Sequence, residues 1–407
     1  MFFDHFSNSS SIQSMEDVTF LRTVFNGLNT LTGVGILSVP YALAVRGWLT
    51  LILFIVVAVI CFYTAILLKR CMDSNSSVKT YRDIGGLAFG LKGKICVASF
   101  MYLELYLIAI EILVLEGDNL VKLFSVKRWD LFGLMKINDR VGFVLLVAFI
   151  VLPTTWMRNM SVLSCVSFCG ILSSLILVVC IIWSGVGDGV GFNEKGTLFD
   201  WSGLPTSLSL FVFCYGGHAM FPLIYTSMHD KSQFSKMMGI CFALVTLCFS
   251  TVAIAGYMMF GPNVKSQITL NLPTEKISSK IAICTTIISP LTKYALLITP
   301  IACDLEKMFG VSQNMIISLL LRTLLVISTT IVALFLPFFG YLSALTGSFL
   351  VSTVSVLMPC ICYLKIFKDS KNKFGFENLI IIAIIVFGVC IAIMGTYISS
   401  KQIITSV

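Results

Sequence analysis

Residues 25–43 read FNGLNTLTGVGILSVPYAL, an apolar run with two glycines near its middle and a proline after them. Residues 210–228 read LFVFCYGGHAMFPLIYTSM and repeat that plan, with glycine and proline at the same spacing. The matched pairs are Gly35 with Pro40 and Gly217 with Pro222. Glycine and proline weaken a helix interior by about 1 and 3 kcal/mol relative to alanine. The two stretches therefore predict two helices that are interrupted at equivalent places.

The composition around these stretches is that of an integral membrane protein. Of the 407 residues, 57% are hydrophobic and only 12% are charged, and the mean hydropathy is +0.96. Soluble domains usually carry about a quarter charged residues, so a soluble fold is excluded. A membrane-spanning helix needs about 20 mostly apolar residues. Apolar windows predict eleven spans, near residues 19–45, 47–71, 93–121, 140–156, 160–184, 203–227, 237–260, 278–303, 313–336, 338–363 and 378–400.

The predicted architecture is an all-α membrane protein with a single transporter-like domain over residues 19–407. Residues 1–18 are polar and form a short tail without the apolar region of a signal peptide. Basic residues are slightly more numerous on the side of the N-terminus than on the opposite side, which favours a cytosolic N-terminus. Spans one and six head two possible five-span repeats. Their ranges are 19–184 and 203–363, and 378–400 is left as an extra helix.

Several other classes of protein are not indicated by the sequence. The net charge is +8, but Lys and Arg fall between apolar runs and form no basic face for nucleic acid. The 14 cysteines lie mostly within apolar runs, and neither a disulfide framework nor zinc spacing is visible. The enzyme motifs HExxH and GxSxG, the P-loop and the dinucleotide fingerprint are missing from the sequence. We expect no enzyme activity, no metal and no cofactor, and a monomer.

The two interruptions predict a binding site in the middle of the membrane. A broken helix exposes backbone N–H and C=O groups, which are tolerated only where protein or a water-filled cavity satisfies them. Short Gly/Pro-interrupted spans at equivalent places in two halves mark the substrate site of many secondary transporters. A half-helix N-terminus carries about half a positive charge and suits a substrate carboxylate. Repeats of odd length would insert with opposite topology, as an inverted-repeat fold requires.

Ionisable residues inside predicted spans also need an explanation, because a charge at the bilayer centre costs about 2.5 to 3.5 kcal/mol. Glu104, Glu111 and Asp118 stand seven residues apart, so they form one acidic stripe that faces the bundle interior. Burial disfavours the charged carboxylate. Glu104 and Glu111 are therefore candidates for proton coupling, whereas structural pairing is the alternative, above all for Asp118.

Three basic side chains near the middle of predicted spans in the second half of the chain also need an explanation. His218 follows the glycine pair directly and is a candidate pH-sensitive group, with simple packing as the alternative. Lys293 lies mid-span after Pro290, where its ammonium could replace a bound sodium ion, so coupling to protons follows more naturally than coupling to sodium. Arg322 is expected to snorkel or to pair with an acidic group.

Five segments together resemble motifs of the amino acid/auxin permease family, and within it the plant vacuolar-type amino acid transporters. The segments are LNTLTGVGILSVPYAL, LELYLIAIEILVLEGDNL, LPTTWMRNMSVLS, FCYGGHAMFPLIYTSM and SPLTKYALLITP. The resemblance covers about residues 19–400. It implies a five-plus-five inverted repeat similar to LeuT in the APC superfamily, proton-coupled transport of amino acids and, often, a vacuolar membrane, with the plasma membrane as the alternative.

Carried onto this chain, the resemblance implies a substrate site between spans one, three and six. The implied substrate-binding residues are Thr32, Gly33, Val34, Gly35 and Ile36 of span one, Phe213, Cys214, Tyr215, Gly216 and Gly217 of span six, and Glu104 and Tyr106 of span three. Neither broken span contains an acidic residue, so neutral amino acids are the expected substrates. An amino-acid-sensing receptor on the same fold, with little transport, is the alternative function.

Overall fold

A computed structural model describes the chain over residues 20–124, 129–131, 135–156, 163–201, 203–311, 313–336, 338–368 and 375–406. The tail predicted for residues 1–18 lies outside the described residues. The chain is almost entirely helical, as predicted. Its longer helices are α3 (Thr50–Asp73), α4 (Tyr81–Phe124), α5 (Asp139–Trp156), α6 (Leu163–Val186), α9 (Phe234–Phe260), α10 (Ile277–Met308), α11 (Met315–Phe335) and α14 (Phe376–Ser406).

The remaining elements are short or join end to end. They are α1 (Phe20–Leu31), η2 (Val34–Leu37), α2 (Val39–Ala44), α7 (Leu204–Cys214), α8 (Phe221–Ser227), η4 (Lys231–Gln233), η5 (Gly261–Asn263), η6 (Ile268–Leu270), α12 (Phe339–Leu345), the π-helix η7 (Thr346–Leu357) and α13 (Met358–Ile366). One antiparallel pair, β1 (Trp129–Leu131) with β2 (Met135–Ile137), lies between α4 and α5.

Eight helical segments of the described residues are long and apolar enough to cross a membrane. They match eight of the eleven predicted spans. The other three predictions fall on α6, whose side chains are described only from Gly170, and on the two broken pairs α1–α2 and α7–α8. Each half of a broken span is too short to count alone, which is the expected result of the Gly/Pro interruptions.

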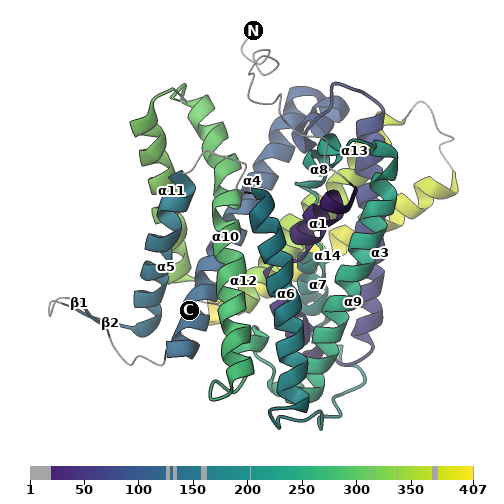
Figure 1. Ribbon diagram of the computed structural model, residues 1–407. Helices are drawn as coiled ribbons and strands as arrows, with labels where there is room; N and C mark the ends of the chain where they lie inside the picture. Colours follow the sequence, from purple (N-terminus) through teal and green to yellow (C-terminus); the bar gives the residue numbers. More distant parts are fainter. Residues whose placement is uncertain are drawn as a thin grey trace.

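The helices form two groups around a central set (Figure 1). Helices α5, α10 and α11 pack against one another on one side, while α3 and α9 pack together on the opposite side. Helix α1, α7 and the long α14 lie between them in the view. Helix α6 contacts α10, α1 and α9, so it borders both groups next to the break in span one.

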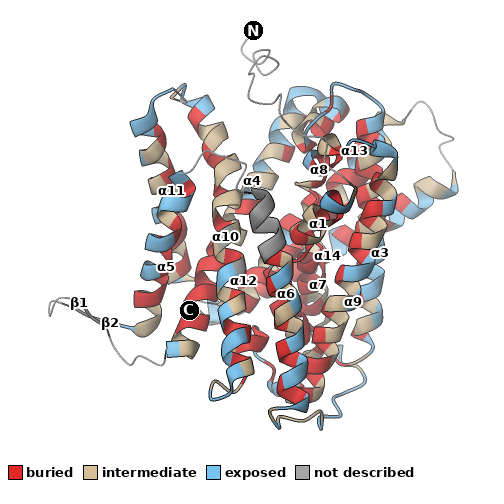
Figure 2. Ribbon diagram, viewed as in Figure 1, coloured by how far each residue is buried: buried red, intermediate tan, exposed pale blue. Residues whose placement is uncertain are grey.

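Burial follows this arrangement (Figure 2). Residues that face the centre of the bundle are buried, whereas outward faces expose large apolar side chains. Phe149, Leu247 and Leu324, for example, are 75%, 67% and 64% exposed. Exposed apolar side chains in such number indicate contact with lipid, because lipid tails are as apolar as these side chains and their exposure to lipid has no hydrophobic cost.

Helix α4 bends sharply near its start. Gly90 has a φ of 67°, which only glycine adopts without strain, so it separates residues 81–89 from the long span that follows. A Cβ on Gly85 would lie 2.6 Å from the Gly93 carbonyl oxygen, so the two arms of the bend pack backbone to backbone. The first arm contains most of residues 79–90, a stretch in which charged and apolar residues are mixed.

Candidate functional site

The first interruption lies between α1 and α2. The Thr32 hydroxyl and N–H both donate to the Leu28 carbonyl, at 2.8 and 2.7 Å, and so end α1. Gly33 is extended, with φ −87° and ψ −164°, and the chain resumes as the 3₁₀ turn η2 before Pro40 starts α2. Proline suits the first turn of a helix because no N–H bond is needed there. The predicted break at residues 32–36 is therefore confirmed.

The second interruption lies between α7 and α8. Helix α7 ends at Cys214, Gly216 and Gly217 carry the chain out of the helix, and Pro222 stands in the first turn of α8. The two breaks touch each other. A Cβ on Gly35 would lie 3.0 Å from the Cα of Cys214, and one on Gly217 would lie 3.2 Å from the Thr30 side chain. A side chain at position 35 would therefore press on the backbone of the second break, whereas one at position 217 would meet only side chains.

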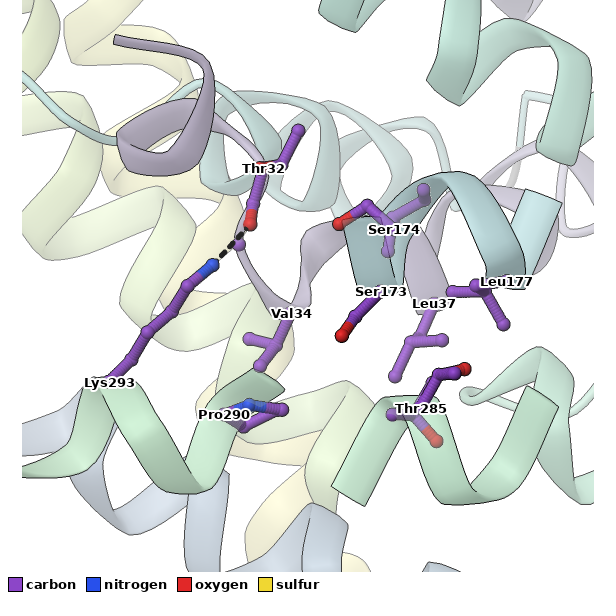
Figure 3. Close-up of a pocket in the computed structure, with 12 residues that line it drawn as sticks. Thr32, Val34, Leu37, Ser173, Ser174, Leu177, Thr285, Pro290 and Lys293 are labelled. Atoms are coloured by element: carbon purple, nitrogen blue, oxygen red, sulfur yellow. Dashed lines mark hydrogen bonds between the residues drawn. The ribbon is translucent and has the colours of Figure 1, made fainter. Parts of the chain in front are cut away.

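A cavity of about 30 Å³ opens beside the first break (Figure 3). This volume admits about two water molecules. Three elements surround it: the break itself, α6 and α10. The lining residues are Thr32, Gly33, Val34, Ile36, Leu37, Ser173, Ser174, Leu177, Thr285, Thr286, Pro290 and Lys293. Hydroxyl-bearing residues of α6 and α10 therefore border the cavity beside the break, and the rest of the lining is mostly apolar.

The ammonium of Lys293 reaches the break from α10. Its Nζ donates to the Thr32 carbonyl oxygen at 2.6 Å and lies 3.4 Å from the Asn29 carbonyl oxygen. These carbonyls lack their helical partners because α1 ends here, so a cation satisfies them. Gly170 on α6 leaves room for this contact, since a Cβ there would lie 2.3 Å from Asn29 Oδ1 and 3.6 Å from Lys293 Cε.

The predicted substrate residues of spans one and six do not all meet at this cavity. Thr32, Gly33, Val34 and Ile36 line it, while Gly35 packs against Cys214. Tyr215 turns toward α9, where its hydroxyl lies 2.9 Å from that of Thr246.

The remaining residues of the second break pack against neighbouring elements. Phe213 is buried, and Gly216 lies against Val351 of η7. Whether these residues touch a substrate stays a prediction.

The predicted residues of α4 point to two neighbours. The Tyr106 hydroxyl donates to Ser328 on α11 at 3.0 Å. Glu111 is fully buried and accepts hydrogen bonds from Thr346 at 2.6 Å and from Ser343 at 3.1 Å. Glu104 is 3% exposed, and its Oε2 has no hydrogen-bond partner among the described residues. The acidic stripe thus faces the bundle interior, as predicted.

Asp118 and His218 both have structural partners. Asp118 accepts from Arg140 at 2.6 Å and from Gln267 at 2.9 Å, which is the structural pairing held open for it. His218 is fully buried, with Nε2 3.0 Å from both the Thr64 hydroxyl and the Cys61 carbonyl oxygen. Because a carbonyl only accepts, Nε2 carries the proton. His218 therefore ties the second break to α3, and a role in pH sensing stays a prediction.

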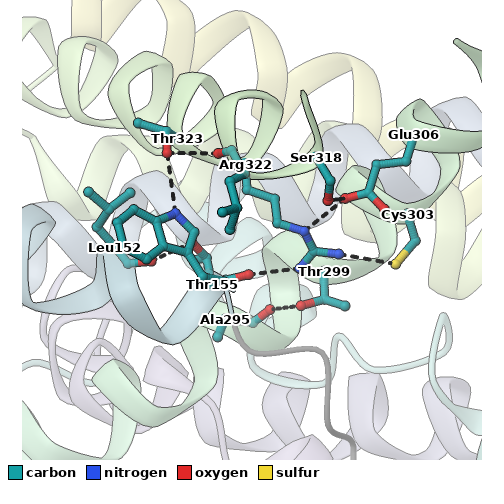
Figure 4. Close-up of polar contacts among 11 residues, drawn as sticks. Leu152, Thr155, Ala295, Thr299, Cys303, Glu306, Ser318, Arg322 and Thr323 are labelled. Carbon is teal, nitrogen blue, oxygen red and sulfur yellow. Dashed lines mark hydrogen bonds and ion pairs between the residues drawn. The ribbon is translucent and has the colours of Figure 1, made fainter. Parts of the chain in front are cut away.

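A second cationic side chain, Arg322, lies buried within the helix group of α5, α10 and α11 (Figure 4). Arg322 is 2% exposed, and its Nε donates to Glu306 at 2.8 Å while NH1 donates to the Thr155 carbonyl at 2.7 Å. Ser318 donates to the same Glu306 oxygen at 2.5 Å. The expected pairing of Arg322 with an acidic group is confirmed, and the pair also caps the end of α5.

The sequence reasoning did not single out several residues that the structure places in prominent positions. Ser173, Ser174, Thr285 and Thr286 line the cavity, and their only signal was a set of hydroxyls within apolar spans. Glu116 is fully buried, and neither of its oxygens has a hydrogen-bond partner in the described part of the chain. Among the described residues, no group of three or more His, Cys, Asp or Glu could hold a metal ion.

Comparison with known proteins assigns these features to a family. The sequence profile described as transmembrane amino acid transporter protein matches residues 16–401. Two relatives from Arabidopsis thaliana, Amino acid transporter AVT1I and Amino acid transporter AVT1J, are each 47% identical to this chain. The first match covers 96% of both chains, and the second covers 95% of this chain and 92% of the relative.

A solved structure has a similar fold. The crystal structure of MhsT in complex with L-phenylalanine superposes with a TM-score of 0.55 over 92% of this chain and 99% of that chain. The two sequences are 13% identical, so the likeness concerns the fold alone.

Proposed function

Because this chain belongs to the transmembrane amino acid transporter family and has a LeuT-like all-α membrane fold, we propose that it carries neutral amino acids by proton-coupled alternating access. The observation that carries the proposal is the paired break. Two interrupted helices meet in the bundle at Gly35 and Cys214, next to a cavity lined by the exposed main chain of the first break. Such unwound segments supply the polar groups that grip a zwitterion.

The substrate carboxylate would meet the N–H groups of residues 32–36, at the beginning of the second half of span one. The second break and α4 would complete the site, with Phe213, Tyr215, Glu104 and Tyr106 nearby. In this reading the five-plus-five inverted repeat lets the broken spans rock against α4, α5, α10 and α11. The cavity has no carboxylate in its lining, which favours a neutral over a cationic substrate.

Proton coupling is supported by the groups around the breaks. The Lys293 ammonium occupies the carbonyls of the first break, where a sodium ion would otherwise find ligands. Among the described residues Lys293 has no carboxylate partner, so its bond depends only on the position of the break. Glu104, Glu111 and His218 are further candidates for carrying the proton. We place the protein as a monomer in the vacuolar membrane, with the plasma membrane as the alternative.

A graded series at Gly33 tests the site. A Cβ at Gly33 meets no atom within 4 Å, so substitutions there enter the cavity without a backbone clash. In proteoliposomes under an imposed pH gradient, Gly33→Ala should keep most of the uptake of labelled neutral amino acids, and Gly33→Leu should abolish it. The Gly33→Leu protein should bind detergent micelles and elute like the wild type. Normal uptake by Gly33→Leu would refute the assignment.

The same vesicles separate transport from sensing. A transporter exchanges labelled for unlabelled amino acid across the membrane, whereas a receptor binds the amino acid without flux. Binding without exchange would replace the proposal by the sensing alternative. A sodium gradient that drives uptake while a pH gradient does not would reject the proton coupling alone.

A further inference from the structure

The π-helix η7 lies directly against the second break. A Cβ on Gly347 would lie 2.1 Å from the Ser209 carbonyl oxygen and 2.8 Å from the Phe213 Cβ. Further along η7, the Val351 side chain would lie 3.0 Å from a Cβ on Gly216 of the second break. Helix α7 and η7 therefore approach backbone to backbone at Ser209, in the middle of α7, and side-chain contacts continue from there to the break. A displacement of η7 would therefore also displace the second break.

The same element holds a carboxylate of α4. Glu111 accepts hydrogen bonds from Thr346, the first residue of η7, and from Ser343 in the turn before it. Ser and Thr hydroxyls inside helices usually donate to a carbonyl three or four residues earlier. Thr353 of η7 does so, donating to the Phe349 carbonyl at 2.5 Å. Ser343 and Thr346 instead direct their hydroxyls across the interface to Glu111.

A line of polar groups continues from Glu111 toward the start of α4. Glu104 lies close enough to both Glu111 and Tyr81 to interact with them electrostatically. The buried Tyr81 hydroxyl donates to the Val354 carbonyl of η7 at 2.5 Å, and the residue next to it, Thr80, is exposed. One oxygen of Glu104 and the Ser355 hydroxyl are buried without a partner among the described residues. Polar groups thus stand between Glu111 and the exposed residue Thr80 at the start of α4.

Other charges around α4 are engaged elsewhere or stand near helix ends. The engaged pairs are Arg140 with Asp118, Arg82 with Asp304, Arg70 with Glu377, Lys69 with Asp73, and Arg322 with Glu306, while Lys293 bonds to carbonyls. Asp139, Lys280, Lys307 and Lys365 stand near helix ends. Tyr102 bonds to Asp304, Tyr106 to Ser328 and Tyr294 to Thr329, and the thiols of Cys71, Cys360 and Cys362 lie near Tyr81. Among the described residues, none of these charges forms an ion pair with Glu111 or Glu104.

We propose that η7 is the coupling element of the transporter. A proton that reaches Glu111 by way of Tyr81 and Glu104 weakens the hydrogen bonds of Glu111 with Ser343 and Thr346. Helix η7 can then move and displace the second break. The inference rests on the proposed function. An ionised carboxylate only accepts hydrogen bonds, and its bonds are roughly twice as strong as those of a neutral acid. Protonation turns one oxygen into a donor, so at least one hydroxyl returns to a helical carbonyl.

Two transport modes in proteoliposomes test the coupling. Counterflow exchange of a labelled neutral amino acid needs no net proton movement, whereas accumulation under a pH gradient does. Glu111→Gln keeps the size of the side chain but cannot ionise, and Ser343→Ala/Thr346→Val removes the hydroxyl donors. We expect both variants to keep exchange and to lose gradient-driven accumulation by at least about tenfold, as the loss of a charge-assisted bond allows.

Ser352→Ala is the matched control. Ser352 also lies on η7 and is fully buried, but its hydroxyl donates to the Gly388 carbonyl on α14, on the other side of the helix. This variant should keep both modes. Tyr81→Phe, which removes one hydroxyl at the surface end, should slow accumulation and spare exchange.

The outcomes separate this inference from the function beneath it. Wild-type accumulation by Glu111→Gln or by the hydroxyl variant would overturn the coupling role of η7, as would an equal loss of exchange and accumulation in folded Glu111→Gln protein. A wild-type protein that exchanges no amino acid would reject the proposed function, whatever the variants do.

Discussion

Lys293 and Arg322 are both cations inside the bundle, on neighbouring helices, yet they are held in different ways. Arg322 shares the carboxylate of Glu306 and a carbonyl of α5, so its partners all belong to one group of packed helices. Within the described part of the chain, Lys293 bonds to main-chain oxygens of the first break. A charge paired with a buried carboxylate cannot leave without stranding that carboxylate. A cation on the carbonyls of a break can leave whenever the break moves.

The comparison therefore separates a fixed part of the molecule from a part that can rearrange. The helices around Arg322 are tied to one another by an ion pair and hydrogen bonds, whereas Lys293 joins α10 to main-chain oxygens of span one. Substitutions near Arg322 should change stability, and those near Lys293 should change transport. The predictions below run from the largest expected effect to the smallest.

Arg322→Met should remove the most stability. It removes the cation that pairs with the buried Glu306 carboxylate, and breaking a buried pair in this way costs about 3–5 kcal/mol. The temperature at which the detergent-solubilised protein aggregates should fall sharply. Arg322→Met/Glu306→Met removes both charges and should recover much of the loss. If Arg322→Met alone melts like the wild type, the pair is not what holds these helices together.

Lys293→Met should change transport far more than stability. The neutral side chain leaves the Thr32 carbonyl without its cation, and a hydrogen bond to a charged group contributes about 1.5–3 kcal/mol. Uptake driven by a pH gradient should fall by about tenfold or more, since about 1.4 kcal/mol corresponds to a factor of ten. The melting temperature should fall less than that of Arg322→Met, because no buried carboxylate loses its cation. Melting as low as that of Arg322→Met would erase the contrast between the two cations.

Gly170→Ala should disturb the Lys293 contact from the side of α6. The added methyl would lie 2.3 Å from Asn29 Oδ1, and overpacking of this kind costs about 1–3 kcal/mol. Uptake should drop several-fold with the protein still folded. Gly239→Ala on α9 is the control, because its Cβ would meet only Phe62, at 3.9 Å. Equal behaviour of the two alanine variants would show that the space at Gly170 does not matter.

Thr323→Val should have the smallest effect. It removes the acceptor of the Trp156 indole N–H, a 3.2 Å contact at the exposed edge of the Arg322 group. A hydrogen bond in this position contributes less than about 1 kcal/mol. Both melting and uptake should change little. If Thr323→Val lowered the melting temperature as much as Arg322→Met does, the contact between Trp156 and Thr323, and not Arg322, would be what holds α5 in place.

Much of the fold followed from local sequence patterns. The two breaks were predicted from Gly/Pro spacing, since paired glycines followed by a proline weaken a helix within one short stretch of sequence. The inward direction of the Glu104–Glu111 stripe was predicted from helical periodicity. The need of Arg322 for an acidic partner followed from the cost of a lone charge in a membrane.

The candidate site was less accessible from the sequence. Residues next to a break were expected to share one cavity, but Tyr215 faces α9 and Gly35 packs on Cys214. The direction of a side chain beside a break depends on how the chain leaves the helix, and no pattern encodes that. The hydroxyls of α6 and α10 in the cavity were missed because serine and threonine are common inside membrane helices.

The sequence by itself determined that this chain crosses a membrane many times, that two of its spans are broken and that charges lie within its spans. These are properties of composition and of neighbours along the chain. Only the tertiary structure decided which groups meet: Lys293 reaches Thr32 across 261 residues, and Thr346 reaches Glu111 across 235. A hydrogen bond needs two groups within about 3 Å, and helix packing alone sets that distance.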